Sequence, residues 1–200
     1  MDDTDPPLIL TLVLAPDAQA AFERDRRAHF PSRLNKIPAH VCLFHHLPGG
    51  SRDAIAARLG AIAAATPRFP VVVDGPMTLG RGVAWRLRSA ALSGLRAALA
   101  AEWDGWLTPQ DRQGYRPHVT IQNKVAPANA KALHMALSEG FQPYEVAADS
   151  LALWRYLGGP WRADGAFPFA ADPGGDPGGG LDCGSDGGRG GAPDQTIGSA

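Results

Sequence analysis

Residues 116–124 read RPHVTIQNK, and this stretch predicts both a local structure and a chemistry. His118 and Thr120 stand two positions apart, and the β-branched residues Val119 and Ile121 stand on either side of Thr120. Side chains two positions apart on a strand point to the same face. We therefore expect the imidazole of His118 and the hydroxyl of Thr120 to lie next to each other on a strand.

A second stretch, PAHVCLFHH at residues 38–46, repeats the order of proline, histidine, valine and aliphatic residue. His40 takes the position of His118, and Cys42 stands where the first stretch has its threonine. Two such strands lying side by side would present two imidazoles to one cleft. Because the unperturbed pKa of histidine is about 6.5, one ring can accept a proton while the other donates one near neutral pH. The two stretches together indicate acid–base chemistry on a small anionic group.

The chain has 200 residues, of which 44% are hydrophobic and 20% charged, and this composition is ordinary for a soluble globular protein. The net charge of −1 provides no global field for nucleic acid, so any phosphate must bind in a local cleft. The N-terminus, MDDTDPP, lacks the basic start and apolar run of a secretory signal, and no stretch approaches a membrane span. We expect a cytoplasmic, monomeric protein without membrane contact. The cysteines, Cys42 and Cys183, are not expected to form a structural disulfide.

Apolar periodicity and turn residues divide the chain into alternating strands and helices. Strands are predicted at residues 8–14, 39–47, 69–73, 77–87, 116–124, 144–146, 150–157 and 161–169, and helices at 16–28, 51–66, 89–103 and 127–139. Gly75 and Pro76 are predicted to turn the chain, and Gly80 and Gly82 to bulge the strand that follows. The basic residues of the first helix, Arg24, Arg26 and Arg27, are expected to face solvent.

This order predicts an α+β fold with two similar lobes, residues 1–75 and 76–169, in a single domain over residues 1–170. From residue 171 onward the chain is dominated by Gly, Pro and Asp. Too few apolar side chains remain there to offset the entropy of ordering. We predict a disordered tail over residues 171–200.

The two histidine stretches resemble the paired His-x-Thr/Ser-x motifs of the 2H phosphoesterases, which include proteins named 2′-5′ RNA ligase and RNA 2′,3′-cyclic phosphodiesterase. Residues 118–121 match the motif fully and residues 40–43 match it imperfectly. The two histidines stand 78 positions apart, which suits one motif in each lobe. The run LALWRYLGGPW at residues 151–161 also resembles the end of bacterial members. The resemblance spans roughly residues 8–169.

The resemblance implies a bilobal fold with two antiparallel sheets flanked by helices and a central cleft. It implies that His40 and His118 are the catalytic acid and base, with the order of roles left open, and that Thr120 and Cys42 hold phosphate oxygens. The implied substrate is an RNA end or a small nucleotide carrying a 2′,3′-cyclic phosphate or a 2′-5′ linkage. Hydrolysis gives a monophosphate, and an RNA 5′-hydroxyl as nucleophile gives 2′-5′ ligation. No metal and no cofactor are implied.

Cys42 departs from the motif, because a thiol is larger than a hydroxyl and donates a weaker hydrogen bond. Phosphate at this corner is expected to be held less firmly. Two interpretations follow: an enzyme in which both imidazoles still work, and a non-catalytic module of the same fold that binds RNA or nucleotide ends.

Four further residues are candidate substrate contacts. Arg81 lies between two glycines and could meet phosphate or could occupy an exposed hairpin turn. Lys124 follows the second motif histidine by six positions, so an ideal strand would place both on one face. Tyr156 is a candidate for stacking on a base or for contacting phosphate, with a core position as the alternative. His46 would share the face of the first motif histidine.

The stretch at residues 38–46 also contains the residue types of a zinc site, namely His40, Cys42, His45 and His46. Adjacent histidines on a strand point to opposite faces, so His45 and His46 could not both join the other two residues. We therefore expect no metal site there.

Overall fold

The computed structural model describes residues 5–171 of the chain, and it contains seven strands and four α-helices. The strands are β1 (Leu8–Leu14), β2 (Val41–Leu47), β3 (Phe69–Thr78), β4 (Val83–Arg88), β5 (His118–Gln122), β6 (Tyr144–Tyr156) and β7 (Trp161–Pro168). The α-helices are α1 (Pro16–His29), α2 (Arg52–Ala65), α3 (Ala90–Glu102) and α4 (Pro127–Ser138). Short 3-10 helices are η1 (Ser32–Leu34), η2 (Gly49–Ser51) and η3 (Asp104–Trp106). The predicted disordered tail from residue 172 and Cys183 lie outside the described residues.

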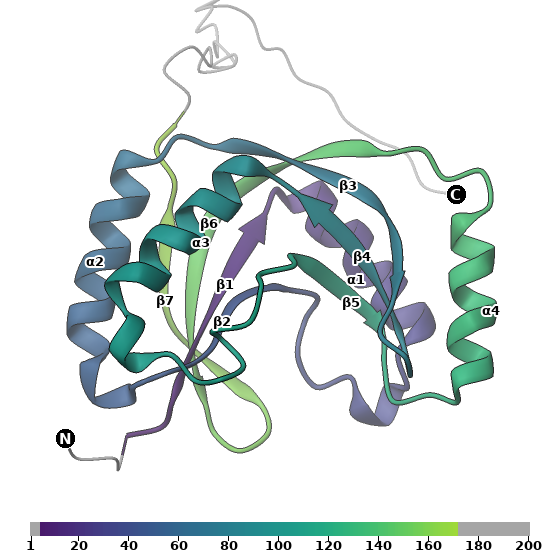
Figure 1. The fold of residues 1–200 in the computed structure, drawn as a ribbon, viewed down its shortest axis with the longest axis horizontal. Helices are drawn as coiled ribbons and strands as arrows, with labels where there is room; N and C mark the ends of the chain where they lie inside the picture. The colour runs from purple at the N-terminus through teal and green to yellow at the C-terminus, as the bar shows by residue number, and fades with distance from the viewer. Residues whose placement is uncertain (1–4, 172–200) are drawn as a thin grey trace, which may run out of the picture.

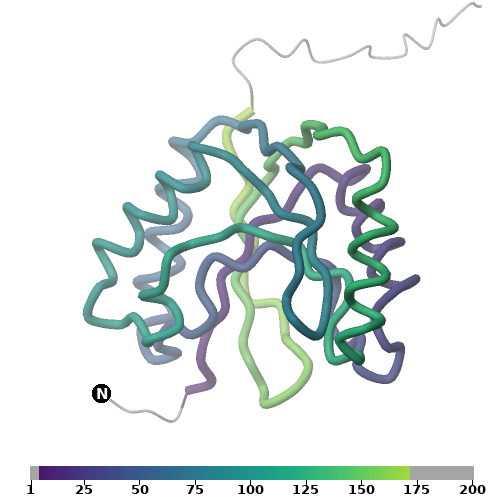
Figure 2. Tube along the Cα trace, turned by 45° about the vertical axis from the view of Figure 1, so that its right-hand side comes forward, coloured from purple at the N-terminus to yellow at the C-terminus, as the bar shows by residue number. Residues whose placement is uncertain are grey.

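All seven strands pair antiparallel in the order β1-β2-β5-β4-β3-β6-β7, and β1 also pairs with β6. This additional pairing closes six strands into a barrel and leaves β7 as a branch on β6. The ribbon in Figure 1 shows α2 and α3 on one side of the sheet and α1 and α4 on the other, and Figure 2 shows the same division. Among the described residues, none of the helices has both the length and the apolar character needed to cross a membrane.

The predicted α+β class is confirmed, whereas the predicted division into two sheets is not. The two halves of the chain join wherever a strand of one half pairs with a strand of the other. Strand β2 pairs with β5 at Val41 and Val119, and the long strand β6 pairs with both β1 and β3. Hydrogen bonds across these seams make one continuous barrel.

The barrel and its helices enclose one hydrophobic core. Strand β1 is apolar except for Thr11, and this suits its position, because Leu8, Leu10, Leu12 and Leu14 are all buried on one face and the opposite face is largely covered as well. Full burial of one such side chain contributes about 1.5–3 kcal/mol. The central strand predicted at residues 8–14 is thereby confirmed, and it supports β2 on one edge.

Helix α1 contradicts the expectation that all its arginines face solvent. Ala18, Phe22 and Arg26 are its buried residues, and they recur at intervals of four. Spacing of four places side chains on one face of a helix, so Arg26 lies on the apolar face that packs toward β5. Its guanidinium donates to the side chain of Asn35 at 2.8 Å and to the Thr120 carbonyl at 2.7 Å, which satisfies the buried charge.

The turn predicted at Gly75 and Pro76 is wrong, because β3 runs through both residues to Thr78. The register between β3 and β4 shifts between Val73 and Gly75, which is a bulge and not a turn. The chain reverses instead at residues 79–82, where a bulged strand was predicted. Gly80 there has φ +74, a conformation that glycine adopts without strain.

Gly82 lies where the β3–β4 turn meets the end of β5. A Cβ atom at this position would be 2.0 Å from the Gln122 carbonyl oxygen and 2.7 Å from the Cα of Asn123. Both contacts are with backbone, which cannot rotate away as a side chain can. The close approach of the β3–β4 turn to the end of β5 therefore requires glycine here.

We predict that Gly82→Ala lowers the free energy of unfolding by about 2–4 kcal/mol, because the new methyl group overlaps the backbone of β5. Gly94→Ala is the matched control, since Gly94 lies in α3 with nothing within 4 Å of its added Cβ. The control should gain about 0.5–1 kcal/mol from helix propensity. Chemical denaturation of both variants measures the difference, and equal effects would contradict the close approach.

Candidate active site

Strands β2 and β5 meet at a single pair of residues, Val41 and Val119. Both valines are 1% exposed and point into the hydrophobic core. Since neighbouring side chains on a strand point to opposite faces, the residues on either side of each valine point away from the core. We call this antiparallel pairing of β2 with β5 the seam. It presents four side chains on the face that points away from the core.

Continuing this register by one residue in each direction places His40 opposite Thr120 and His118 opposite Cys42. Directly opposite residues of an antiparallel pair have Cβ atoms about 4.5–5.5 Å apart. The two motifs therefore face each other head to tail, with an imidazole at each of two diagonal corners. All four side chains are partly exposed.

Both imidazoles are held by the same local bond. His40 Nδ1 lies 2.8 Å from the carbonyl oxygen of Pro38, and His118 Nδ1 lies 2.8 Å from that of Arg116. A carbonyl oxygen only accepts, so each Nδ1 carries a hydrogen and each Nε2 is the nitrogen free to exchange a proton. The mirrored bonds fix ring orientation and tautomer at both corners.

The surroundings of His40 are more enclosed than its motif alone suggests. Its ring centroid lies 4.7 Å from that of Trp161, which in turn lies 6.2 Å from the ring of Trp154. Burial lowers the pKa of His40 to about 4, and the charges of Arg26 and His118 lower it as well. The bond to the Pro38 carbonyl acts in the opposite direction and is outweighed. His40 is therefore neutral at pH 7, with its Nε2 lone pair available.

On the His118 side, the seam opens into a pocket of about 290 Å³. It is lined by Cys42, His45, Arg96, Asp111, Tyr115, Arg116 and other residues of the 110–118 segment.

The predicted alternation along β2 fails beyond Cys42. The register against β1 shifts twice, between Leu8 and Leu10 and between Leu10 and Thr11. Each shift inverts the alternation, so after the first shift Phe44 is buried and His45 lines the pocket, and after the second the original alternation returns, with Leu47 buried like Val41. His46, predicted to share the face of His40, is exposed and does not line this pocket.

Asp111 anchors the loop before β5 to strand β2. Its carboxylate accepts from the backbone N–H groups of His45 and His46, at 2.9 and 3.1 Å, and from His45 Nδ1 at 3.0 Å. Burial by itself raises the pKa of Asp111, but these hydrogen bonds outweigh it and lower the pKa. A charged, buried carboxylate thus orients a third imidazole toward the pocket.

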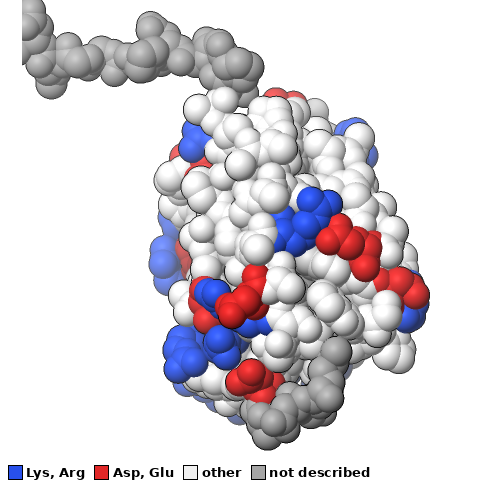
Figure 3. Space-filling view, turned by 90° about the vertical axis from the view of Figure 1, so that its left-hand side faces the viewer, with Lys and Arg blue, Asp and Glu red and all other residues white. Residues whose placement is uncertain are grey.

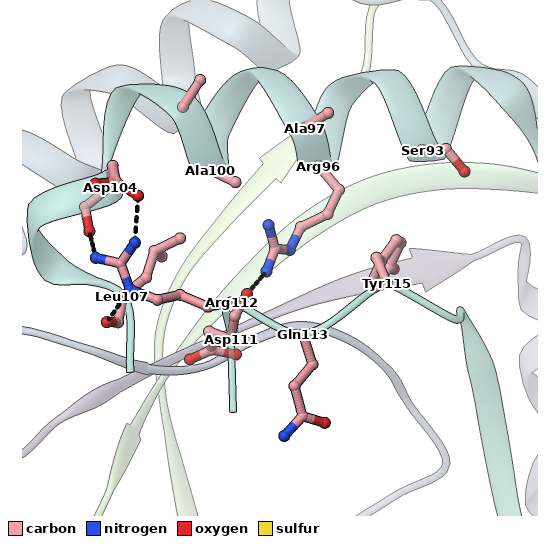
Figure 4. A pocket seen from close by; sticks show the side chains of 11 residues that line it. Ser93, Arg96, Ala97, Ala100, Asp104, Leu107, Asp111, Arg112, Gln113 and Tyr115 are labelled. Carbon is pink, nitrogen blue, oxygen red and sulfur yellow. Dashed lines mark hydrogen bonds and ion pairs between the residues drawn. The ribbon is translucent and has the colours of Figure 1, made fainter. Parts of the chain in front are cut away.

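Arg96 of α3 holds the same loop from the other side. Its Nε donates to the Leu43 carbonyl at 2.8 Å, its guanidinium lies 3.8 Å from the centre of the Phe44 ring, and a terminal nitrogen donates to the Asp111 carbonyl. Figure 4 shows Arg96 reaching from α3 to Asp111 across a neighbouring pocket of about 440 Å³. The bonds of Arg96 and the carboxylate of Asp111 together fix the loop that leads to His118.

The thiol of Cys42 makes a local hydrogen bond, from Sγ to the Phe44 carbonyl at 3.4 Å. Burial raises the pKa of Cys42 far above its usual range, and the negative charge of Asp111 adds to the effect. The sulfur therefore stays protonated at pH 7 and is not a nucleophile there. Within residues 5–171, no group of three His, Cys, Asp or Glu side chains could hold a metal ion.

The sequence profile of the 2′-5′ RNA ligase superfamily matches residues 14–160, which is most of the chain and both histidine motifs. The chain belongs to this superfamily. The resemblance to the 2H phosphoesterases is thereby confirmed. No curated protein sequence matches the chain.

Solved structures confirm the superfamily fold at low sequence identity. The crystal structure of TT0787 of Thermus thermophilus is 17% identical, with a TM-score of 0.59, and the match covers 82% of this chain and 97% of that one. E. coli LigT in its apo form is 16% identical, with a TM-score of 0.55 and coverage of 82% and 97%. E. coli LigT complexed with 3′-AMP is 16% identical, with a TM-score of 0.51 and coverage of 82% and 98%.

The other residues predicted to contact substrate are Arg81, Lys124 and Tyr156, and the structure places each of them in a different element. Arg81 is exposed in the β3–β4 turn and donates from Nε to the Val125 carbonyl at 3.2 Å. Lys124 lies beyond the end of β5, so the strand face that it was predicted to share with His118 does not extend to it. Tyr156 is 42% exposed at the end of β6 and is not a core residue. Their contacts with substrate stay predictions.

Three residues beside the motifs were missed by the sequence reasoning, namely Arg26, Asp111 and Trp161. The spacing of four from Ala18 to Arg26 could have identified the arginine as part of a buried face. Trp161 opens the strand after the Gly158–Pro160 turn, and only the pairing of β6 with β7 brings it back over His40. Asp111 had no sequence signal, because its partners depend on the bulges in β2.

The depressed pKa of His40 predicts an acid-dependent loss of stability. Between pH 6.5 and about 4 the unfolded chain binds a proton at this ring that the folded protein does not, so stability falls as pH falls through this window. Between pH 7 and pH 4.5 the free energy of unfolding should fall by about 2 kcal/mol less in His40→Gln than in the wild type. Urea denaturation across this range measures it, with His134→Gln on α4 as the control for removing an imidazole. Parallel pH curves for His40→Gln and wild type would contradict the burial argument.

Proposed function

We propose that this protein is a metal-independent phosphodiesterase that acts on a 2′,3′-cyclic phosphate or a 2′-5′ phosphodiester at an RNA end or in a small nucleotide. The observation that carries the proposal is the seam at Val41 and Val119, where two imidazoles with free Nε2 atoms occupy diagonal corners. A phosphodiester needs a proton removed from the attacking oxygen and one delivered to the leaving oxygen. Two mirrored imidazoles on one face supply both.

We assign the two roles from the surroundings of the two rings. His40 is neutral at pH 7, so its Nε2 takes the proton from the attacking water. His118 borders the open pocket, and its Nε2 delivers the other proton, to the departing ribose oxygen. The water oxygen bonds to phosphorus as the bond to that ribose oxygen breaks, and the product is a ribose monophosphate. An RNA 5′-hydroxyl in place of water would form a 2′-5′ linkage.

Thr120 and Cys42 occupy the other two corners, where non-bridging phosphate oxygens would lie. The hydroxyl of Thr120 donates a stronger hydrogen bond than the thiol of Cys42, so we propose that Thr120 carries more of the phosphate binding. LigT of E. coli has been crystallised with phosphate, 3′-AMP, ATP and NADP⁺, and these ligands all contain phosphate. We retain the expectation of a monomeric cytoplasmic enzyme.

A non-catalytic module that binds nucleotide ends is the second candidate, because the Cys42 thiol is already bonded to a backbone carbonyl. Incubation with a 2′,3′-cyclic mononucleotide in the presence of a chelator distinguishes the two. Formation of the monophosphate supports the enzyme. Binding without product supports the module, and activity that chelation abolishes would show that a metal takes part.

Replacing His40 or His118 by alanine should each reduce kcat by about 10² to 10⁴, the range for a positioned acid or base. The double variant should lose less than the product of the two single losses, because both rings act in one transfer. Initial rates with a cyclic mononucleotide measure these effects, and circular dichroism controls for folding. A histidine whose replacement left turnover unchanged but lowered the melting temperature sharply would be structural.

Cys42→Thr restores the motif hydroxyl and tests the weakest corner. We expect tighter phosphate binding or faster turnover by roughly 0.5–1.5 kcal/mol, the net value of one hydrogen bond. Cys42→Ala, the control, should change both quantities little. Isothermal titration with inorganic phosphate and denaturation provide the two readouts. A destabilised Cys42→Thr with unchanged phosphate affinity would mean that position 42 faces an apolar environment, and the first half of the site would then be abandoned.

A further inference from the structure

A third cavity, of about 700 Å³, lies beside the His40 corner of the seam. We call it the basic pocket and define it by six of its lining residues, Arg26, Phe30, Arg33, Lys36, Lys124 and Pro160. Its walls come from the end of α1, the segment around η1, the chain after β5 and the β6–β7 turn. Figures 1 and 2 show the η1 segment and the β6–β7 turn projecting from the same end of the barrel.

The charge of the basic pocket is unbalanced. Within residues 5–171, no carboxylate lines it, and Arg33, Lys36 and Lys124 take part in no ion pair with a described residue. The face formed by α2 and α3 differs, since Figure 3 shows basic and acidic side chains next to one another there. Arg58 on that face pairs with Glu102 at 2.7 Å. With a net charge of −1 for the chain, local cations without partners indicate an anionic ligand.

The basic pocket also has an aromatic wall. The guanidinium of Arg26 lies 4.1 Å from the centre of the Phe30 ring, and bonds to Asn35 and to the Thr120 carbonyl hold it there. An aromatic ring with cations around it fits a nucleobase that stacks while its phosphates meet the charges. An inorganic anion or a carboxylate would meet the charges without making use of the ring.

Two contacts connect the basic pocket to the proposed reaction site. Arg26 bonds the backbone of Thr120, and its charge acts on His40. Pro160 directly precedes Trp161, which packs against the ring of His40. A strand whose terminal phosphate lies between the two histidines can therefore continue into the basic pocket with its next nucleotide.

The backbone conformation of Lys124 supports a role for this residue in ligand binding. Its φ of 60° is the left-handed conformation, and among residues 5–171 no other residue besides glycine has a positive φ. Lysine is strained in this conformation, which glycine and asparagine adopt more readily. The strain is held locally, since the Lys124 N–H donates to the Asn123 side chain at 2.7 Å. A strained residue whose side chain lines a ligand-sized cavity suggests selection for binding.

We propose that the basic pocket binds the nucleotide next to the reacting phosphate, so that the preferred substrate is a single-stranded RNA end and not a free mononucleotide. The inference rests on the proposed function for the identity of the reacting group, because a 2′,3′-cyclic phosphate requires a ribose. Binding of the flanking nucleotide depends only on the basic pocket itself.

The binding test uses a fluorescein-labelled single-stranded oligoribonucleotide with a terminal phosphate, titrated at several salt concentrations. The variant Arg33→Gln/Lys36→Gln should reduce affinity about tenfold at 0.15 M salt. It should also lower the slope of log K against log salt by about 1.4, or about 0.7 for each phosphate that the variant no longer neutralises. Arg58→Gln/Lys131→Gln removes the same charge from α2 and α4 and should bind like the wild type. Equal affinities and slopes for the two double variants would overturn the proposal.

The turnover test separates this inference from the proposed function. The ratio of kcat/KM for the RNA end to kcat/KM for the cyclic mononucleotide should fall about tenfold in Arg33→Gln/Lys36→Gln and stay constant in the control. A wild type that turns over neither substrate contradicts the proposed function, and the salt titration still tests the basic pocket. Normal turnover with an unchanged ratio overturns the inference alone. Competition by polyglutamate as effective as that of RNA would also overturn it.

Lys124→Asn gives a readout in which stability and binding move in opposite directions. Asparagine relaxes the left-handed backbone, so the melting temperature should rise by about 2 °C while RNA affinity falls about fourfold. Thermal denaturation and the same RNA titration measure the two effects. A rise in melting temperature with unchanged RNA affinity would show that Lys124 does not contact the strand.

Discussion

The backbone pairing of Val41 with Val119 is the constraint on which the proposed site depends. Their burial in the core fixes which face of each strand is dry, and the alternation of side chains then puts both motif histidines on the other face. The pairing also joins the two halves of the chain into one barrel. Burial of the two valines thus fixes the positions of the two histidines, because a shift of register by one residue would bury the histidines and expose the valines.

Buried polar contacts keep the surroundings of this seam in place. Asp111 bonds two consecutive backbone N–H groups of a bulged strand, and Arg96 bonds a carbonyl of that strand and one of the loop. Removing Arg96 would leave buried carbonyls without a donor, and removing Asp111 would leave two part-buried N–H groups without an acceptor. The irregularity in β2 therefore depends on side chains from α3 and from the loop that precedes His118.

The sequence was sufficient to predict the α+β class, the helices and the two histidine strands, because those features depend on local periodicity. It failed where a distant partner decides the local structure. The bulges in β2 against β1 change which face of the strand the side chains after Cys42 lie on. The chain stays extended at Gly75 because β4 pairs with it. The burial of Arg26 similarly depends on the Thr120 carbonyl as its partner.

The two motif histidines make the same local hydrogen bond, so a difference in role between them has to come from what packs around them. Trp161 and the charge of Arg26 lie against His40, and they favour the neutral ring. His118 borders a pocket with the polar loop around Asp111. In the proposed mechanism, the elements that differ around the two imidazoles, a β6–β7 turn on one side and a loop anchored to α3 on the other, would distinguish base from acid. The same turn forms part of the basic pocket, so the elements that set the chemistry of His40 also shape the surface beside it.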